Sequence, residues 1–256
     1  MERTGRQRGS IVKHRAGPPF TKTLGHRGTA VPRILHFTAG PQDWQALLAD
    51  PQKHWRTGFS ARTLAYCWEA AQGMPPEVAA VFASSNEPLL ADFTPIIAVP
   101  EFKVPLPGGD RPSQNDLFLL GRSKAGPVSV MVEGKVSESF GPTIAEWRKD
   151  ASAGKEERLS FLLRTIGLST VPDAARYQLF HRAASAVLEG ERYRAVAAVM
   201  LVHSFSQDRA CWPDYQAFLQ LFDVRAKVGA LQRLPSAQRV PLFAAWVLGD
   251  CKFLSS

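Results

Sequence analysis

Residues 194–204 form a nearly unbroken apolar segment, and this segment constrains the fold more than any other part of the chain. Its apolar side chains do not alternate with polar ones, as they would in a strand with one face in water. The pattern is typical of a central strand that is covered on both faces. Residues 240–248 form a second segment of this kind. Both segments therefore indicate a sheet that lies between layers of helices.

Helices are predicted along most of the length of the chain. Apolar spacing, caps and helix breakers place them at residues 41–48, 61–72, 155–166, 174–188 and 213–222, and a further helix is expected to begin at 141–142 and to contain Trp147. Ser60 is a favourable N-cap for the helix at 61–72. The helix at 41–48 is expected to stop before Pro51, and the next one before Pro75 and Pro76.

The strands of the sheet are predicted in three further segments. Residues 78–107 are rich in valine, isoleucine and phenylalanine but are interrupted by prolines, which favours extended segments and an irregular edge strand. Residues 116–121 and 128–136 are expected to be strands joined by a hairpin loop. Together the elements predict one α/β domain over residues 34–256, with a central mixed sheet flanked by helices.

The formal net charge of +8 is concentrated at the N-terminus. Residues 1–33 contain eight Lys and Arg and a single Glu, so they carry +7 and leave +1 for residues 34–256. We interpret residues 1–33 as a basic, disordered tail, which is either an arm that holds nucleic acid through its phosphates or an unstructured leader. No apolar segment typical of a secretory signal follows the basic residues, and no apolar run approaches the length of a membrane span.

The three cysteines, Cys67, Cys211 and Cys251, lie far apart in apolar surroundings. No pair of Cys or His residues has the spacing of a zinc site, and the pattern does not support a disulfide framework. We therefore expect three reduced, buried thiols and a cytoplasmic location.

Three charged residues stand at the ends of the two predicted hairpin strands. Asp116 opens the first strand, and Glu133 and Lys135 close the second, separated by Gly134. Alternate residues of a strand point to the same face, so Glu133 and Lys135 share a face that Asp116 reaches if the strands pair as a hairpin. Two carboxylates and an ammonium group in one place suggest a divalent metal ion and an activated water.

The neighbouring helices add two polar residues. Glu69 lies on the helix that precedes the strands, and Gln178 lies on the longer helix that follows them. With these flanks, Asp116 and residues 133–135 resemble the PD-(D/E)XK nuclease superfamily, over roughly residues 60–204. The resemblance implies a restriction-endonuclease-like fold.

The resemblance also implies a role for each residue. Asp116 and Glu133 would bind Mg²⁺ or Mn²⁺, and the carbonyl group of Gly134 would complete the metal shell. Lys135 would orient the attacking water and stabilise the developing charge. The auxiliary residues of the site would be Glu69 and Gln178.

Two positions depart from the superfamily pattern. Asn115 stands where the motif has proline, and Arg182 stands where one branch has a tyrosine four residues after its glutamine. Arg182 and Arg176 could bind phosphate, but a solvated helix face is the simpler interpretation of both. Glu138 is a weaker candidate, as a spare carboxylate. His181 could contact a phosphate or the metal shell, but a helix-surface or core position is the simpler interpretation.

The implied function is a divalent-metal-dependent nuclease that hydrolyses phosphodiester bonds, with DNA as the expected substrate, no membrane partner and a homodimer as a candidate assembly. Two alternatives stay open. The first is an inactive nuclease-like module that binds nucleic acid or protein, and the second is a metal-dependent hydrolase of a small phosphorylated substrate. Because residues 34–256 carry little net charge, a local patch or the basic tail would have to supply the affinity for phosphate.

Overall fold

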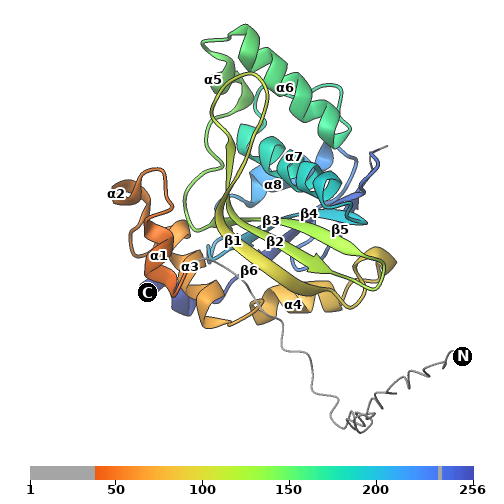
Figure 1. Cartoon of the computed structure of the whole chain (residues 1–256). Coiled ribbons are helices and arrows are strands. Elements are labelled where there is room, and N and C mark those ends of the chain that lie inside the picture. Colours follow the sequence, from red (N-terminus) through yellow and green to blue (C-terminus); the bar gives the residue numbers. More distant parts are fainter. Residues whose placement is uncertain (1–37, 236–237) are drawn as a thin grey trace, which may run out of the picture. The chain divides into compact units, whose positions relative to one another are not determined.

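A computed structural model of the chain describes residues 38–235 and 238–256. Its centre is a six-stranded mixed sheet with the strand order β1-β2-β3-β4-β6-β5 (Figure 1). Helices cover both faces of the sheet, so the predicted α/β domain with a central mixed sheet is confirmed. The prediction of a disordered tail at 1–33 falls outside the described residues.

The sheet combines an antiparallel half with a parallel half. In the antiparallel half, β2 pairs with both β1 and β3. In the other half, β4 lies parallel to β3 and β6 lies parallel to β4, and the short edge strand β5 runs antiparallel to β6. The strands are β1 (Thr94–Val104), β2 (Ser113–Arg122), β3 (Pro127–Lys135), β4 (Ala197–Ser204), β5 (Gln232–Leu234) and β6 (Leu242–Leu248).

The two apolar segments form strands that are covered on both faces, as predicted. Every residue of β4 is buried, and so is every residue of β6 except Leu248. An apolar layer lies on each side, with Trp68 and Phe82 on one face of the sheet and Phe180 and Tyr215 on the other. Burial on both faces explains why no alternation is visible in the sequence of these strands.

The helices form two layers that come from different parts of the chain. The N-terminal helices pack on one face of the sheet and the later helices on the other (Figure 1). The first layer contains α1 (Pro41–Gln45), α2 (Pro51–His54), α3 (Ser60–Ala70) and α4 (Pro76–Ala83). The second contains α5 (Ile144–Arg148), α6 (Ala153–Ile166), α7 (Tyr177–Arg192) and α8 (Trp212–Gln220). Two 3₁₀ helices, η1 (Pro88–Leu90) and η2 (Cys251–Ser255), complete the described elements.

Prolines that were interpreted as helix breakers are the first residues of two helices. Pro51 begins α2, whose N-cap Asp50 accepts a hydrogen bond from the backbone of Lys53, and Pro76 begins α4. The prediction of extended structure from residue 78 onward was therefore wrong for α4, although β1 is the predicted edge strand. Proline in the first turn costs a helix nothing because the N–H that it lacks would have no partner there.

The start of α3 also differs from the prediction. Phe59 is the N-cap residue and Ser60 is already in the helix. The backbone N–H of Ser60 donates to the Glu138 carboxylate at 2.7 Å, so a residue far along the chain satisfies this terminal donor.

None of the helices in the described ranges has the length and apolar character needed to cross a membrane.

Candidate functional site

The end of β3 lies beside the start of β2, which brings the two predicted carboxylates together. Leu117 pairs with Val132, so one further step along this register sets Asp116 next to Glu133. The two side chains point to the face of the sheet that α7 covers, because both are in contact with Arg182 of that helix. The hairpin therefore places them as the sequence predicts.

Glu133 is buried between two cations. Lys135 Nζ donates to Glu133 Oε1 at 2.6 Å, and Arg182 Nε donates to Glu133 Oε2. Burial alone would raise the pKa of Glu133, but the charges of Arg182 and Lys135 outweigh it and hold the pKa below its ordinary value. Glu133 is therefore ionised near neutral pH, and each of its oxygens has a charged partner.

Lys135 and Gln178 meet, as expected from the resemblance. Lys135 Nζ donates to Gln178 Oε1 at 3.1 Å, in addition to its contact with Glu133, and lies 4.9 Å from the centroid of the Phe140 ring. The side chain of Lys135 is 5% exposed. Three neighbours thus fix the ammonium group in a site that is nearly closed to solvent.

Asp116 is held by the backbone of the residue between Glu133 and Lys135. Gly134 N–H donates to Asp116 Oδ2 at 2.8 Å, while Asp116 Oδ1 lies 3.6 Å from Arg182 Nη2. Burial, and then the charge of Glu133, raise the pKa of Asp116 to about 7, against the opposing effect of Arg182. A Cβ atom at position 134 would lie 3.3 Å from the Leu64 side chain and 3.4 Å from Asp116 Oδ2, so the glycine lets β3 pack closely against α3 at this point.

A third carboxylate, Glu101 on β1, joins the pair and was not predicted. Glu101 is buried, and its neighbours Pro100 and Phe102 pair with the residues on either side of Asp116. Its backbone has φ +50°, in the left-handed region that non-glycine residues seldom adopt. Gln114 donates to its carboxylate at 2.7 Å.

The charge state of Glu101 depends on its neighbours. Burial, and then the charge of Asp116, raise the pKa of Glu101 to about 8. The sequence does give one indication of this residue, since Glu101 is an acidic residue that directly follows the apolar residues 95–100. Its partner could not be read from the sequence, because the pairing of β1 with β2 decides it.

Arg182 is a central residue of the site, and its interpretation as part of a solvated helix face was wrong. It lies one helical turn after Gln178 on α7, so the two side chains leave the helix on the same side. Its side chain is 6% exposed and contacts both Glu133 and Asp116. Arg176, by contrast, is partly exposed and pairs with Asp214 at 3.1 Å.

His181 lies beside this network rather than in the cavity. Its Nδ1 is 2.8 Å from the Ser113 hydroxyl and accepts from Arg182 Nη1 at 3.3 Å. Burial, and then the charge of Arg182, lower the pKa of His181 well below its ordinary value. A neutral histidine that accepts from Arg182 helps to orient the guanidinium group, and this placement is that of a hydrogen-bonded core residue rather than of a phosphate contact.

The structure does not bring Glu69 to the other predicted residues. Trp44 Nε1 donates to Glu69 Oε1 at 2.7 Å, and the Thr38 hydroxyl donates to the same oxygen at 2.9 Å. The residues of α3 that face the site are Ser60 and Ala61, at the opposite end of the helix. Glu69 therefore fastens α1 to α3.

Glu138, predicted as a spare carboxylate, does line the site. Its two carboxylate oxygens accept hydrogen bonds from the backbone N–H groups of Ser60 and Val136. Glu138 thus links the start of α3 to the segment after β3.

The three carboxylates, Lys135, Gln178, Arg182 and Glu138 line a cavity of about 350 Å³, whereas Glu69, Arg176 and His181 do not. Its walls come from the segment around α1 and α2, from the start of α3, and from the segment after β3. The lining residues are Leu48, Ala49, His54, Ser60, Ala61, Glu101, Gln114, Asp116, Glu133, Lys135, Glu138, Ser139, Gly141, Gln178 and Arg182.

The oxygen donors of the cavity fit a hard divalent cation. Carboxylate oxygens are the ligands that Mg²⁺ and Mn²⁺ prefer. Asp116 Oδ1 is farther from Arg182 than a hydrogen bond reaches, so it can still coordinate an ion, and Glu101 lies beside it. An ion that also used Glu133 would compete there with Lys135 and Arg182.

Cys67, Glu77 and His203 form a second group of potential metal ligands, with one donor atom of each within 4.8 Å of the others. Trp68 Nε1 donates to His203 Nδ1 at 3.2 Å, so the neutral imidazole carries its proton on Nε2 and donates it to Glu77 at 3.1 Å. Burial lowers the pKa of His203, which favours this neutral form. A metal-ligating histidine would instead donate from its second nitrogen. The group is therefore a hydrogen-bonded chain that joins α3, α4 and β4.

The thiols are free, as predicted, but they are not all buried. Cys67 and Cys211 are buried, whereas Cys251 is exposed on η2. Burial raises the pKa of the Cys67 thiol, which makes this side chain unreactive.

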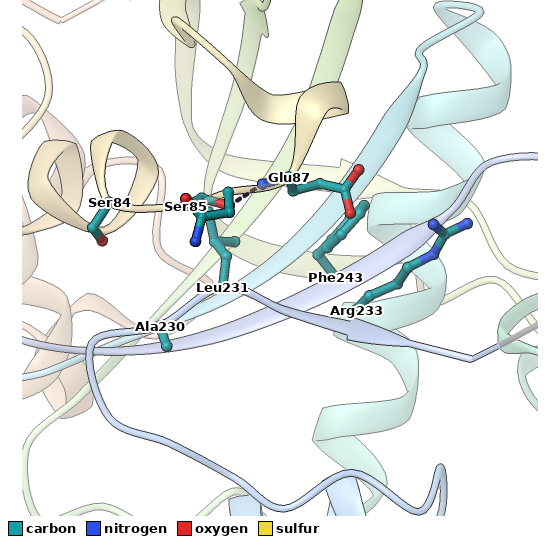
Figure 2. Close-up of a pocket in the computed structure, with 8 residues that line it drawn as sticks. Ser84, Ser85, Glu87, Ala230, Leu231, Arg233 and Phe243 are labelled. Atoms are coloured by element: carbon teal, nitrogen blue, oxygen red, sulfur yellow. Dashed lines mark hydrogen bonds between the residues drawn. The ribbon is translucent and has the colours of Figure 1, made fainter.

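A larger hollow of about 420 Å³ lies between the end of α4 and the edge formed by β5 and β6 (Figure 2). Its charged lining residues are Glu87 and Arg233, and Glu87 already accepts from the backbone of Leu89. Figure 2 shows no group of carboxylates comparable with Asp116, Glu133 and Glu101. The chemistry therefore favours the smaller cavity as the candidate site.

Residues 37–251 match a protein family described as a domain of unknown function (DUF6946). The chain belongs to this family. No curated protein and no solved structure matches the chain. The DUF6946 region contains every residue that lines the cavity, so the site lies wholly within the family domain.

Proposed function

We propose that this DUF6946 domain is a divalent-metal-dependent nuclease that hydrolyses phosphodiester bonds, with DNA as its substrate. The observation that carries the proposal is the convergence of Asp116, Glu133 and Lys135 on one cavity. The order of elements supports it, because α3 precedes the three-stranded antiparallel unit and α7 follows it with Gln178 in contact with Lys135. This arrangement agrees with the resemblance to the PD-(D/E)XK nucleases.

The residues divide the chemistry among them. Asp116 and Glu133 would hold Mg²⁺ or Mn²⁺ with the carbonyl group of Gly134, and Glu101 adds a carboxylate at the same place. The ion, when bound, polarises the phosphate and lowers the pKa of a bound water. Lys135, fixed by Glu133 and Gln178, donates to the attacking water or to the phosphate oxygen that gains charge.

The affinity for phosphate has to come from local groups. Arg182 and Lys135 are cations of the cavity itself, and His54 lies on its wall. An arriving phosphate would offer Arg182 an alternative anionic partner and so ease its release from Glu133. We place this activity in the cytoplasm, in agreement with the free thiols.

The test is cleavage by purified protein. Single- and double-stranded DNA and RNA are incubated with Mg²⁺ or Mn²⁺ and wild type, Asp116→Ala or Lys135→Ala. Asp110→Ala is the matched control, because Asp110 is an exposed aspartate that does not line the cavity. Loss of cleavage in both site variants but not in the control supports the proposal. Cleavage that survives in both site variants refutes the assignment.

A second function is favoured by a specific observation. Both oxygens of Glu133 are already paired with Lys135 and Arg182, which is the charge balance expected of an inactive nuclease-like module that binds nucleic acid without an ion. Thermal unfolding with increasing Mn²⁺ separates the two functions. An enzyme should be stabilised by the ion, and the gain should vanish in Asp116→Ala. A wild-type melting temperature that does not respond to Mn²⁺ favours the binding module.

A further inference from the structure

The acting groups lie at the floor of the cavity rather than on an open surface. Glu133 and Lys135 have side chains that are 2% and 5% exposed, and Asp116, the most accessible of the three, is 19% exposed. A phosphodiester must therefore enter the cavity before it can reach them.

One wall of the cavity is built by residues 41–54, which we call the cap. Leu48, Ala49 and His54 of the cap line the cavity. Ser139 and Gly141, from the segment after β3, line the same cavity. The cap thus restricts the approach to the carboxylates on the side of α1 and α2.

The cap is attached to the domain at several points. Trp44 is buried and donates to Glu69, and Gln42 donates to the Tyr66 hydroxyl at 2.9 Å. Gln114 of β2 donates to the backbone oxygen of Leu47 at 3.5 Å. The cap is thus held by both α3 and β2. A ligand of the size of one nucleotide could enter beside it without displacing it, whereas a much wider ligand would collide with it.

The size of the cavity sets the scale of what can enter. A volume of about 350 Å³ lies near the lower end of the range of roughly 300 to 1,000 Å³ found for small-molecule sites. The backbone phosphates of a duplex lie on its outer surface, but the duplex on either side of a phosphate is far wider than a cavity of this volume. The cap would therefore meet a continuous duplex before its phosphate reached the buried Glu133 and Lys135.

From these walls and this volume we infer that the cavity takes one unpaired nucleotide with its phosphodiester and excludes duplex nucleic acid. The inference rests on the proposed function and names its substrate class. The cap is the structural element that would discriminate between single strand and duplex, because its residues Leu48, Ala49 and His54 line one side of the cavity.

The test compares three substrates in Mn²⁺. They are thymidine 5′-(p-nitrophenyl phosphate), a single-stranded oligonucleotide and a relaxed, covalently closed duplex circle. We expect cleavage of the first two, and cleavage of the circle that is slower by roughly 100-fold because strands must first separate. Comparable rates on the circle and on the single strand overturn the inference but leave the nuclease function standing.

A matched pair of cap variants tests the wall itself. Ala49 and Ala46 are both exposed alanines of the cap, but of the two only Ala49 lines the cavity. Ala49→Phe should narrow the cavity and raise the KM for the single strand by about tenfold, which is the effect of losing about one favourable contact. Ala46→Phe should leave this KM unchanged. Equal effects of the two substitutions overturn the role of the cap.

A binding measurement separates this inference from the nuclease function. If wild type cleaves none of the three substrates, the nuclease function is refuted, and calorimetric titration with thymidine 5′-monophosphate in Ca²⁺ decides whether the cavity takes a nucleotide. Binding by wild type and Ala46→Phe that becomes about tenfold weaker in Ala49→Phe supports the nucleotide site. Absence of binding by wild type overturns it.

Discussion

Substitution of Arg182 by leucine tests the charge balance of the site. In the folded protein the guanidinium group donates to Glu133 and lies 3.6 Å from Asp116, in a place where its side chain is 6% exposed. Leucine keeps the apolar stem but leaves two buried carboxylates with Lys135 as their cationic neighbour. Removing one partner of a buried ion pair costs about 3 to 5 kcal/mol, because the remaining charge is no longer compensated.

The control is an ion pair of similar length that is exposed. Arg148 and Glu156 are 2.6 Å apart, and their side chains are 41% and 44% exposed. Removal of such a pair changes stability little, because water and salt screen the two exposed charges. Urea unfolding followed by tryptophan fluorescence, in EDTA near neutral pH, should therefore separate Arg182→Leu clearly from Arg148→Leu. Equal losses in the two variants would refute the argument from burial.

Two further measurements connect this loss to the carboxylates. The double variant Glu133→Gln with Arg182→Leu should recover part of the lost stability, because it removes the uncompensated charge. Mn²⁺ should restore Arg182→Leu more than it stabilises wild type, by up to about 2.7 kcal/mol at a concentration of 100 times Kd. If the ion stabilises both proteins equally, Arg182 does not compete with a metal ion for these oxygens.

Two more predictions concern the pH dependence of stability and the packing around one glycine. The raised pKa values of Asp116 and Glu101, about 7 and about 8, mean that both bind protons more tightly in the folded chain than in the unfolded one. Their contribution to stability is complete below about pH 4 and is lost as the pH rises through 7 and 8, so the metal-free urea midpoint should fall over this range; a rising midpoint would contradict it. A Cβ at Gly121 would lie 2.2 Å from Phe93, so Gly121→Ala should cost about 1 to 3 kcal/mol in the same assay. Gly40→Ala, whose Cβ would be 3.7 Å from the nearest atom, should change little.

The elements that the sequence predicts best are those that carry their own local signal. The unbroken apolar run identifies β4 because a strand covered on both faces has no polar side. Local signals gave the wrong prediction for α4. Pro75 and Pro76 follow one helix, as predicted, but they also begin the next one. Proline has both meanings, and only the packing of the following residues on the sheet decides between them.

The candidate site divides in the same way. Glu133 and Lys135 could be predicted to meet, because alternation along one strand fixes their common face. Arg182 and Glu101 could not, because their approach depends on how α7 lies across β3 and on the pairing of β1 with β2. The prediction for Glu69 was wrong for a related reason. The first residues of α3 lie at the cavity, whereas Glu69 lies near the other end of the helix and contacts Trp44.

The pairing of Glu133 with Lys135 and Arg182 has a consequence for the order of events in biosynthesis. A domain whose metal-ligating side chains repel each other, or have no counterion in the protein, needs its metal ion in order to fold. Here the chain supplies its own counterions, so the hairpin of β2 and β3 can close and α7 can dock on it without any ion. Under the proposed metal-dependent function, maturation would consist of a late exchange of the Arg182 guanidinium group for a metal ion, and the amount of folded protein would not depend on the supply of metal in the cell.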